Sequence, residues 1–185
     1  MPKYQEKQTE PITLEAFTEI IEKGRFTQLL SHKSFLAFLY WFGVRRSEAL
    51  ERVREDFRVE DGVLIVEAPA KKGGSRKALE IYVDLPFVDL IMEQVNRIRP
   101  SRRVWSFSHT TAWKIVKRAM GRNYYPHFFR LNRATQFLED PNTTTPEMMG
   151  WFGWKSKRTV DSYVGFTHRY IKGMRERLKE QAKAS

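Results

Sequence analysis

The chain of 185 residues contains no cysteine. Disulfide bonds, thiol catalysis and zinc sites with thiolate ligands are therefore excluded. Histidine is scarce as well, and the four present (His32, His109, His127 and His168) do not have the spacing of metal ligands. We therefore expect neither a metal site nor a cofactor.

Long apolar segments are also missing. The longest apolar run, from Phe35 to Val44, is too short to span a bilayer. The N-terminus is polar and has no apolar signal region. These two features predict a cytoplasmic protein without a membrane span.

Acidic residues are too few to balance the basic ones. The sequence has 33 Lys and Arg against 22 Asp and Glu, which gives a net charge of +11. This excess predicts a polyanionic partner, with nucleic acid as the first candidate and an anionic membrane surface as the second. A hydrophobic fraction of 41% and an aromatic fraction of 14% indicate a folded protein with a real core.

The pattern of apolar residues predicts helices on both sides of one small sheet. Residues 1–11 have the composition of a flexible arm. Thr13 caps a first helix, and Ser31 or Ser34 begins a second, very apolar helix that Gly43 interrupts.

Between residues 57 and 85 the apolar period changes to that of strands. Two short β runs meet at Asp61-Gly62, a strong hairpin signal, and a third strand follows a Lys-Lys-Gly-Gly turn. After Pro86 the helical patterns return, and one of these helices has Thr145 as its expected cap. The predicted class is α+β, mostly α-helical, with one three-stranded antiparallel sheet.

Several polar residues allow a structural and a catalytic explanation. Arg45 follows the apolar helix and must be paired, and Glu48 lies on the same helical face. The pair is either an ordinary ion pair or an arginine that presents its other donors to a phosphate. Lys71 and Lys72 are either solvated turn lysines or include a proton donor to a leaving oxygen.

The same ambiguity applies further along the chain. His127 and Arg130 form a His-x-x-Arg pair, and Trp154 can pack in a core or donate its indole N–H to a phosphate oxygen. Tyr163 stands among cations, Lys155, Lys157, Arg158, His168 and Arg169. Neighbouring positive charge favours the phenolate and hence a nucleophile, although a half-buried helix tyrosine is the simpler explanation.

Taken in order, these residues resemble the catalytic domain of the tyrosine recombinases, or phage integrase family, which shares its fold with type IB topoisomerases. The resemblance covers residues 11–175 approximately and rests on four segments: "FGVRRSEAL" with Arg45, "AKKGGSRKALEIYV" with Lys71, "PHFFRLNRATQFL" with His127 and Arg130, and "FGWKSKRTVDSYVGFT" with Trp154 and Tyr163. Arg45 rather than Arg46 matches through its spacing to Gly43.

The sequence departs from the family pattern in places. Trp154 stands where most members have His, Leu131 stands where a second His often follows the arginine, and Lys72 competes with Lys71 for the role of catalytic lysine. Residues 12–185 correspond to the catalytic domain alone, so we expect no N-terminal core-binding domain in this chain.

The resemblance implies a site-specific recombinase or integrase that cuts and rejoins double-stranded DNA through a 3′-phosphotyrosine at Tyr163, without metal or ATP. It implies DNA contacts by five basic side chains, Lys72, Lys114, Lys117, Arg118 and Lys155. It also implies a homotetramer on DNA, from a monomer in solution, with a last helix that docks on a neighbouring subunit through Ile171, Met174 and Leu178.

Three alternatives remain open from the sequence. The same residues suit a resolvase or a relaxing type IB topoisomerase. A DNA-binding module that no longer cuts would share the charge but would have no need of the complete residue set. A basic RNA-binding protein is the third, although no RNA-binding signature is present.

Overall fold

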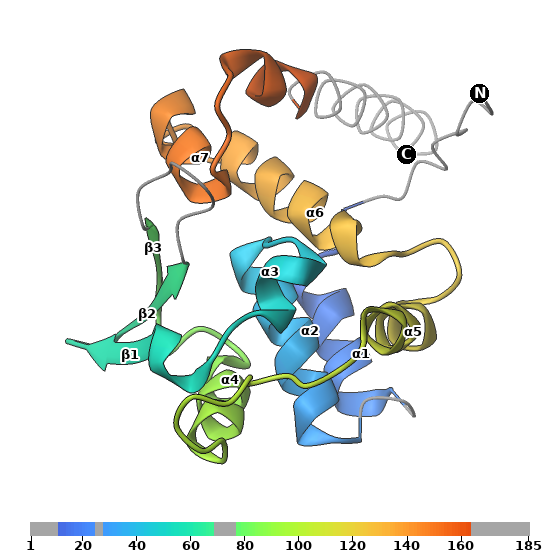
Figure 1. Cartoon of the computed structure of the whole chain (residues 1–185). Helices are drawn as coiled ribbons and strands as arrows, with labels where there is room; N and C mark the ends of the chain where they lie inside the picture. Colours follow the sequence, from blue (N-terminus) through green and yellow to red (C-terminus); the bar gives the residue numbers. More distant parts are fainter. Residues whose placement is uncertain (1–10, 25–27, 69–76, 164–185) are drawn as a thin grey trace. The chain divides into compact units, whose positions relative to one another are not determined.

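The computed structural model describes residues 11–24, 28–68 and 77–163 (Figure 1). The chain divides into two compact units, of which the first ends at Arg133 and the second begins at Ala134. The predicted arm over residues 1–11, the turn with Lys71 and Lys72, and the predicted last helix lie outside the described residues, apart from Pro11. The single catalytic domain expected over residues 12–185 therefore stays a prediction.

The first helix, α1 (Leu14–Lys23), begins after Thr13, the cap residue that the sequence predicts. The Thr13 side chain accepts a hydrogen bond from the Ala16 N–H at 3.2 Å, which satisfies one of the open donors at the helix start. On its inner face, Phe17 is fully buried and stacks on Tyr40 with ring centroids 4.1 Å apart. This stack fixes α1 against the second helix.

The second helix, α2 (Leu30–Phe42), is the centre of the first unit, and every residue from Ser34 to Phe42 is buried. The prediction that Ser31 or Ser34 begins this helix is wrong, because Leu29 is its cap residue. Ser34 lies inside the helix, where its hydroxyl accepts a hydrogen bond from the Trp105 indole at 3.0 Å. A buried hydroxyl needs such a partner, and here the partner comes from a distant segment.

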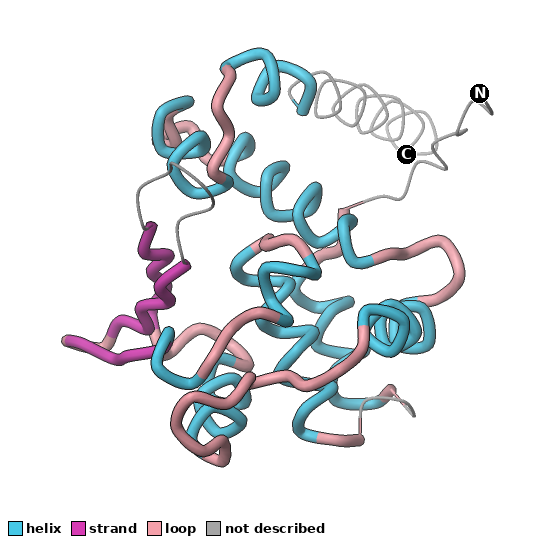
Figure 2. The backbone as a smooth tube through the Cα atoms, viewed as in Figure 1, coloured by secondary structure: helices cyan, strands magenta, loops and turns pink. Residues whose placement is uncertain are grey.

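The predicted three-stranded antiparallel sheet is confirmed. Strands β1 (Phe57–Glu60), β2 (Val63–Ala68) and β3 (Lys77–Tyr82) pair in the order β1-β2-β3, and Figure 2 shows them side by side. The β1–β2 turn places Asp61 and Gly62 at φ values of 48° and 77°. Two-residue hairpin turns of type I′ need positive φ at both positions, which explains the Asp-Gly sequence.

Short helices connect the sheet to the rest of the first unit. Helix α3 (Arg46–Leu50) and the 3-10 turn η1 (Arg54–Asp56) precede β1. After β3 come α4 (Val88–Asn96), α5 (His109–Met120) and α6 (Pro126–Glu139). Among the described helices, none is long and apolar enough to cross a bilayer.

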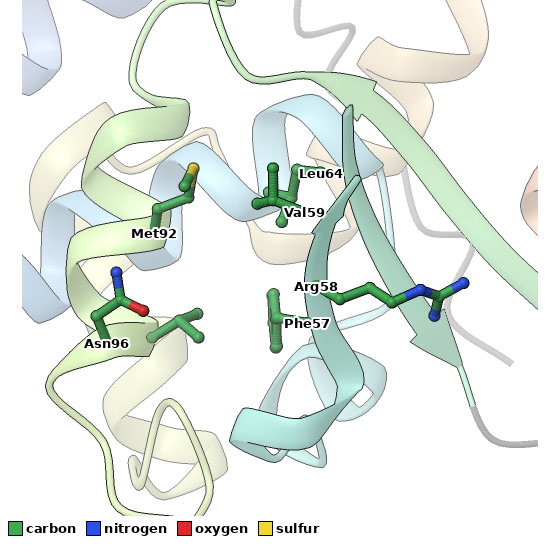
Figure 3. Close-up of a pocket in the computed structure, with 7 residues that line it drawn as sticks. Phe57, Arg58, Val59, Leu64, Met92 and Asn96 are labelled. Carbon is green, nitrogen blue, oxygen red and sulfur yellow. The ribbon is translucent and has the colours of Figure 1, made fainter. Parts of the chain in front are cut away.

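A pocket of about 250 Å³ lies between the hairpin and α4 (Figure 3). Phe57, Val59, Leu64, Met92 and Val95 give it a mainly apolar lining, to which Asn96 and the backbone side of Arg58 contribute. The Arg58 guanidinium points away from the pocket in Figure 3. None of the predicted catalytic residues that the structure describes lines this pocket.

The second unit is built around aromatic rings. It contains the later part of α6, the helix α7 (Thr145–Phe152) and a helical segment over residues 157–163. Its core comprises Ala134, Met148, Phe152, Trp154 and Val160. The cap of α7 is Thr144 and not the predicted Thr145. The capping box forms between Thr144 and Glu147, which places Thr145 inside the helix.

Candidate functional site

Arg45 is held at the start of α3 by a single carboxylate. Gly43 ends α2 with a left-handed φ of 57°, which turns the chain so that Arg45 becomes the cap residue of α3. Its backbone N–H donates to Glu48 Oε2 at 2.9 Å, and its Nη1 donates to Glu48 Oε1 at 2.7 Å. The Arg45 side chain is 45% exposed, so that the fixed guanidinium still faces solvent.

Arg130 approaches the same carboxylate from α6. It is 1% exposed, its Nη1 donates to the Gly43 carbonyl at 3.3 Å, and the same nitrogen lies 4.0 Å from Glu48 Oε2. A buried guanidinium needs a counter-charge and hydrogen-bond acceptors, and Glu48 with Gly43 supplies both. The described structure therefore joins Arg45, Glu48 and Arg130 into one cluster.

The pKa of Glu48 is lower than its ordinary value. Burial of the carboxylate raises the pKa, but the hydrogen bonds from Arg45 and the charges of Arg130 and Arg45 outweigh burial. Glu48 is therefore a carboxylate at neutral pH, which holds Arg45 by hydrogen bonds and attracts the Arg130 guanidinium by its charge.

His127 lies three residues before Arg130 on α6, which places the two side chains on the same side of that helix. The residue is exposed, yet its pKa is lowered, first by partial desolvation of the ring and then by the charges of Arg130 and Arg45. Glu48 opposes this shift only in part. The imidazole is consequently neutral at pH 7 and able to accept a proton.

In the second unit, Trp154 and Tyr163 form part of a three-ring stack. The Phe152 and Trp154 centroids are 4.5 Å apart at 23°, and those of Trp154 and Tyr163 are 4.7 Å apart at 29°. Trp154 is 8% exposed and Tyr163 is half-buried. Phe152 is not among the site residues predicted from the sequence, although its place two residues before Trp154 in an aromatic-rich segment is a signal for it.

The other predicted site residues separate into three groups. Lys114, Arg118 and Lys155 are exposed, as DNA contacts require. Lys117 is half-buried, because its ammonium donates to the Arg122 carbonyl and lies 5.1 Å from the Trp113 ring centroid. Lys71 and Lys72 fall outside the described residues.

In the part of the chain that the structure describes, no three His, Asp or Glu side chains are grouped as metal ligands.

The chemistry of the first-unit cluster points to an anion with several oxygens. Two arginines share one carboxylate, and a neutral histidine stands beside the buried arginine. Guanidinium groups bind phosphate oxygens through paired N–H donors, and a neutral imidazole exchanges protons. This donor set suits a phosphodiester.

No family model and no curated protein matches the sequence. Solved structures do match. They include the site-specific recombinase XerH bound to difH substrate in a pre-cleavage complex, with a TM-score of 0.67 and 17% identity over 85% of this chain and 51% of that one. The fold is that of a tyrosine recombinase catalytic domain.

Two further structures share this tyrosine recombinase fold. The XerA recombinase has a TM-score of 0.67 and 16% identity over 98% of this chain and 66% of that one. The Tn1549 transposon integrase, in complex with circular intermediate DNA, has a TM-score of 0.58 and 15% identity over 84% of this chain and 63% of that one. The chain spans about half the length of XerH. The fold class predicted from the sequence is thereby confirmed.

Proposed function

We propose that the chain is a site-specific DNA recombinase or integrase that cleaves and rejoins double-stranded DNA through a covalent 3′-phosphotyrosine at Tyr163. The observation that carries this proposal is the cluster in which Glu48 holds Arg45 and Arg130, with the neutral His127 beside Arg130. The recombinase fold and the net charge of +11 support it.

In the proposed reaction, the Tyr163 hydroxyl loses its proton and its oxygen attacks a backbone phosphorus. A phosphorus–tyrosyl oxygen bond forms, the bond to the 5′ oxygen breaks, and the leaving oxygen takes a proton from Lys71. The number of phosphoester bonds does not change, so the step needs no ATP. A 5′-hydroxyl from the same or another strand reverses it.

The roles of the other residues follow from where charge develops. The transition state gains negative charge on the non-bridging oxygens, which fixed donors stabilise without reorganisation. Arg45 and Arg130 bind these oxygens, Glu48 orients both arginines, and Trp154 donates its indole N–H. His127 accepts the phenol proton, a role that its lowered pKa suits.

The exposed basic side chains bind the DNA backbone. We assign this role to Lys114 and Arg118 on α5 and to Lys155, with Lys72 and Lys117 as further contacts. Phosphate contacts release counterions, so binding weakens as the salt concentration rises. We further propose a cytoplasmic protein that assembles from monomers into a tetramer on DNA.

A nicked suicide substrate tests the chemistry directly. Duplexes with candidate sites and a nick close to the cleavage position are incubated with the protein and EDTA, and covalent adducts are separated on a denaturing gel. The released fragment cannot religate, so the adduct accumulates. Tyr163→Phe is compared with Tyr82→Phe, because Tyr82 is 67% exposed on β3 and has no proposed role.

We expect an adduct with the wild type and with Tyr82→Phe, none with Tyr163→Phe, and a mass that maps the link to Tyr163. Strand exchange between two labelled duplexes then separates a recombinase from a relaxing topoisomerase. Salt-sensitive DNA binding without an adduct on any substrate contradicts the proposal and favours a module that binds without cutting.

A further inference from the structure

Arg52 is a buried arginine to which the proposed chemistry gives no role. It is 3% exposed and lies in the short link between α3 and η1. Its Nε donates to the Glu48 carbonyl at 2.8 Å, and its Nη1 donates to the Glu67 carbonyl at 2.7 Å. The same Nη1 lies 3.3 Å from Asp56 Oδ2, which supplies the counter-charge.

The first of these contacts caps α3. The last carbonyl groups of a helix have no partner within the helix, and Glu48 contributes one of them. A guanidinium at that position satisfies the carbonyl and interacts favourably with the negative end of the helix. Since α3 has only five residues, it needs contacts from outside the helix to keep its shape.

The second contact joins α3 to the sheet. Glu67 is the residue before the last one of β2, where it pairs with Ala78 of β3. One guanidinium therefore bridges the C-terminal end of α3 and the end of β2. Because the guanidinium is planar and rigid, neither element can shift without lengthening one of the two hydrogen bonds.

We propose that Arg52 is a positioning residue for the pair formed by Arg45 and Glu48. Arg52 clamps α3 to the end of β2, and α3 carries Glu48, whose carboxylate orients Arg45. The consequence for DNA cleavage rests on the proposed function, whereas the clamp itself does not. Charge alone does not explain Arg52, because a buried lysine would also neutralise Asp56 but could not bridge two carbonyls from separate nitrogens.

Arg52→Lys tests the bridge and keeps the charge beside Asp56. Arg58→Lys is the matched control, because the Arg58 guanidinium contacts the Glu67 carboxylate and not its carbonyl. Leu79→Ala controls for lost stability, since Leu79 is 2% exposed in β3 and makes none of these contacts. Each variant is examined by hydrogen exchange of α3, unfolding, DNA affinity and the adduct rate at saturating protein.

We expect Arg52→Lys to raise hydrogen exchange of α3 about tenfold and to lower the adduct rate about 10- to 100-fold, because small misplacements of catalytic groups are costly. DNA affinity should stay within about twofold, since Arg52 is buried and contacts no DNA. Arg58→Lys should change neither exchange nor rate, and Leu79→Ala should lower stability without opening α3 selectively.

Two results would overturn the proposal. One is unchanged protection of α3 in Arg52→Lys, and the other is a rate loss no larger than that of Leu79→Ala at equal stability. If Arg52→Lys does not fold, Asp56→Asn replaces it as the test. This variant removes the counter-charge of Arg52 but leaves both hydrogen bonds to the Glu48 and Glu67 carbonyls. Protection of α3 that stays unchanged in Asp56→Asn supports the clamp, whereas selective opening of α3 overturns it, because the ion pair and not the bridge would then hold α3. A wild type that forms no adduct refutes the proposed function, and hydrogen exchange still decides whether Arg52 clamps α3.

Discussion

Replacement of Glu48 by glutamine is the sharpest test of the arginine cluster. Glutamine has nearly the same shape, but it carries no charge and one of its two acceptor oxygens becomes a donor nitrogen. Arg130 is 1% exposed and would lose the carboxylate that lies 4.0 Å from its Nη1. Arg45 would lose at least one of its two hydrogen bonds to the carboxylate.

The expected loss can be worked from these contacts. Removing one member of a buried ion pair costs about 3–5 kcal/mol of stability. The cost here should be at or below the lower end of that range, because Arg130 Nη1 and Glu48 Oε2 are 4.0 Å apart and the Glu48 side chain is 17% exposed. The Arg45 contact adds only about 0.5–1 kcal/mol, because Arg45 is 45% exposed. We therefore expect a loss of about 3 kcal/mol in the free energy of unfolding, or roughly 6–12 °C in Tm for a chain of this length.

The assay is urea unfolding at pH 7, followed by the same comparison at lower pH. The control is Glu51→Gln, an exposed glutamate at the end of α3 whose replacement should cost less than about 0.5 kcal/mol. Glu48 has a lowered pKa when folded, so its contribution is complete above its ordinary pKa of 4.5 and is lost as the pH falls through the lowered value. The difference in the free energy of unfolding between wild type and Glu48→Gln should therefore become smaller only below pH 4.5.

The reasoning is refuted if Glu48→Gln loses no more stability at pH 7 than Glu51→Gln. It is also refuted if the difference between wild type and Glu48→Gln stays constant down to the acid-unfolding range. In either case the carboxylate would not be the counter-charge of the buried Arg130.

Three further predictions concern the reaction. Trp154→Phe keeps a ring to stack on Tyr163 but removes the indole N–H, so the transition state should lose about 1.5–3 kcal/mol of stabilisation and the adduct rate should fall roughly 10- to 150-fold. Because Trp154 is also a core residue, the variant should lose stability as well, and the rate is therefore measured where the variant is fully folded; an unchanged rate there would make Trp154 a packing residue alone. The adduct rate should fall with decreasing pH at a value below 6.5, through the lowered pKa of His127, and this acid limb should vanish in a His127→Gln pH profile. In a DNA substrate with sulfur in place of the 5′-bridging oxygen, the leaving group needs no proton. This substrate should therefore restore cleavage by Lys71→Ala and leave the rate of Lys72→Ala unchanged; restored cleavage by Lys72→Ala instead would make Lys72 the proton donor.

The sequence by itself determined the features that depend on contacts between residues a few positions apart. Thr13 caps α1 because its side chain reaches a backbone N–H three residues on, and Asp61-Gly62 makes the hairpin because these residues tolerate positive φ. The pairing of Arg45 with Glu48 could be predicted for the same reason, since the two side chains are three residues apart at the start of one helix.

Tertiary structure decided the features that depend on a distant partner. Ser34 has the chemistry of a helix cap, but its contact with Trp105, 71 residues away, places it in the core of α2. Arg130 meets Gly43 across 87 residues, and no local pattern indicates that a helical arginine is buried there. Arg52 is the clearest case, because its position in a charged segment suggests exposure.

The physical reason is that a polar group is buried only where acceptors and counter-charges converge on it. Such convergence is a property of the folded chain and not of any short segment. The sequence alone determined the recombinase-like order of the residues, which segments form helices and which form strands, and the Arg45–Glu48 pair. Only the folded structure could show that Arg130 shares the Glu48 carboxylate, that Tyr163 stacks on Trp154, and that Arg52 links α3 to β2.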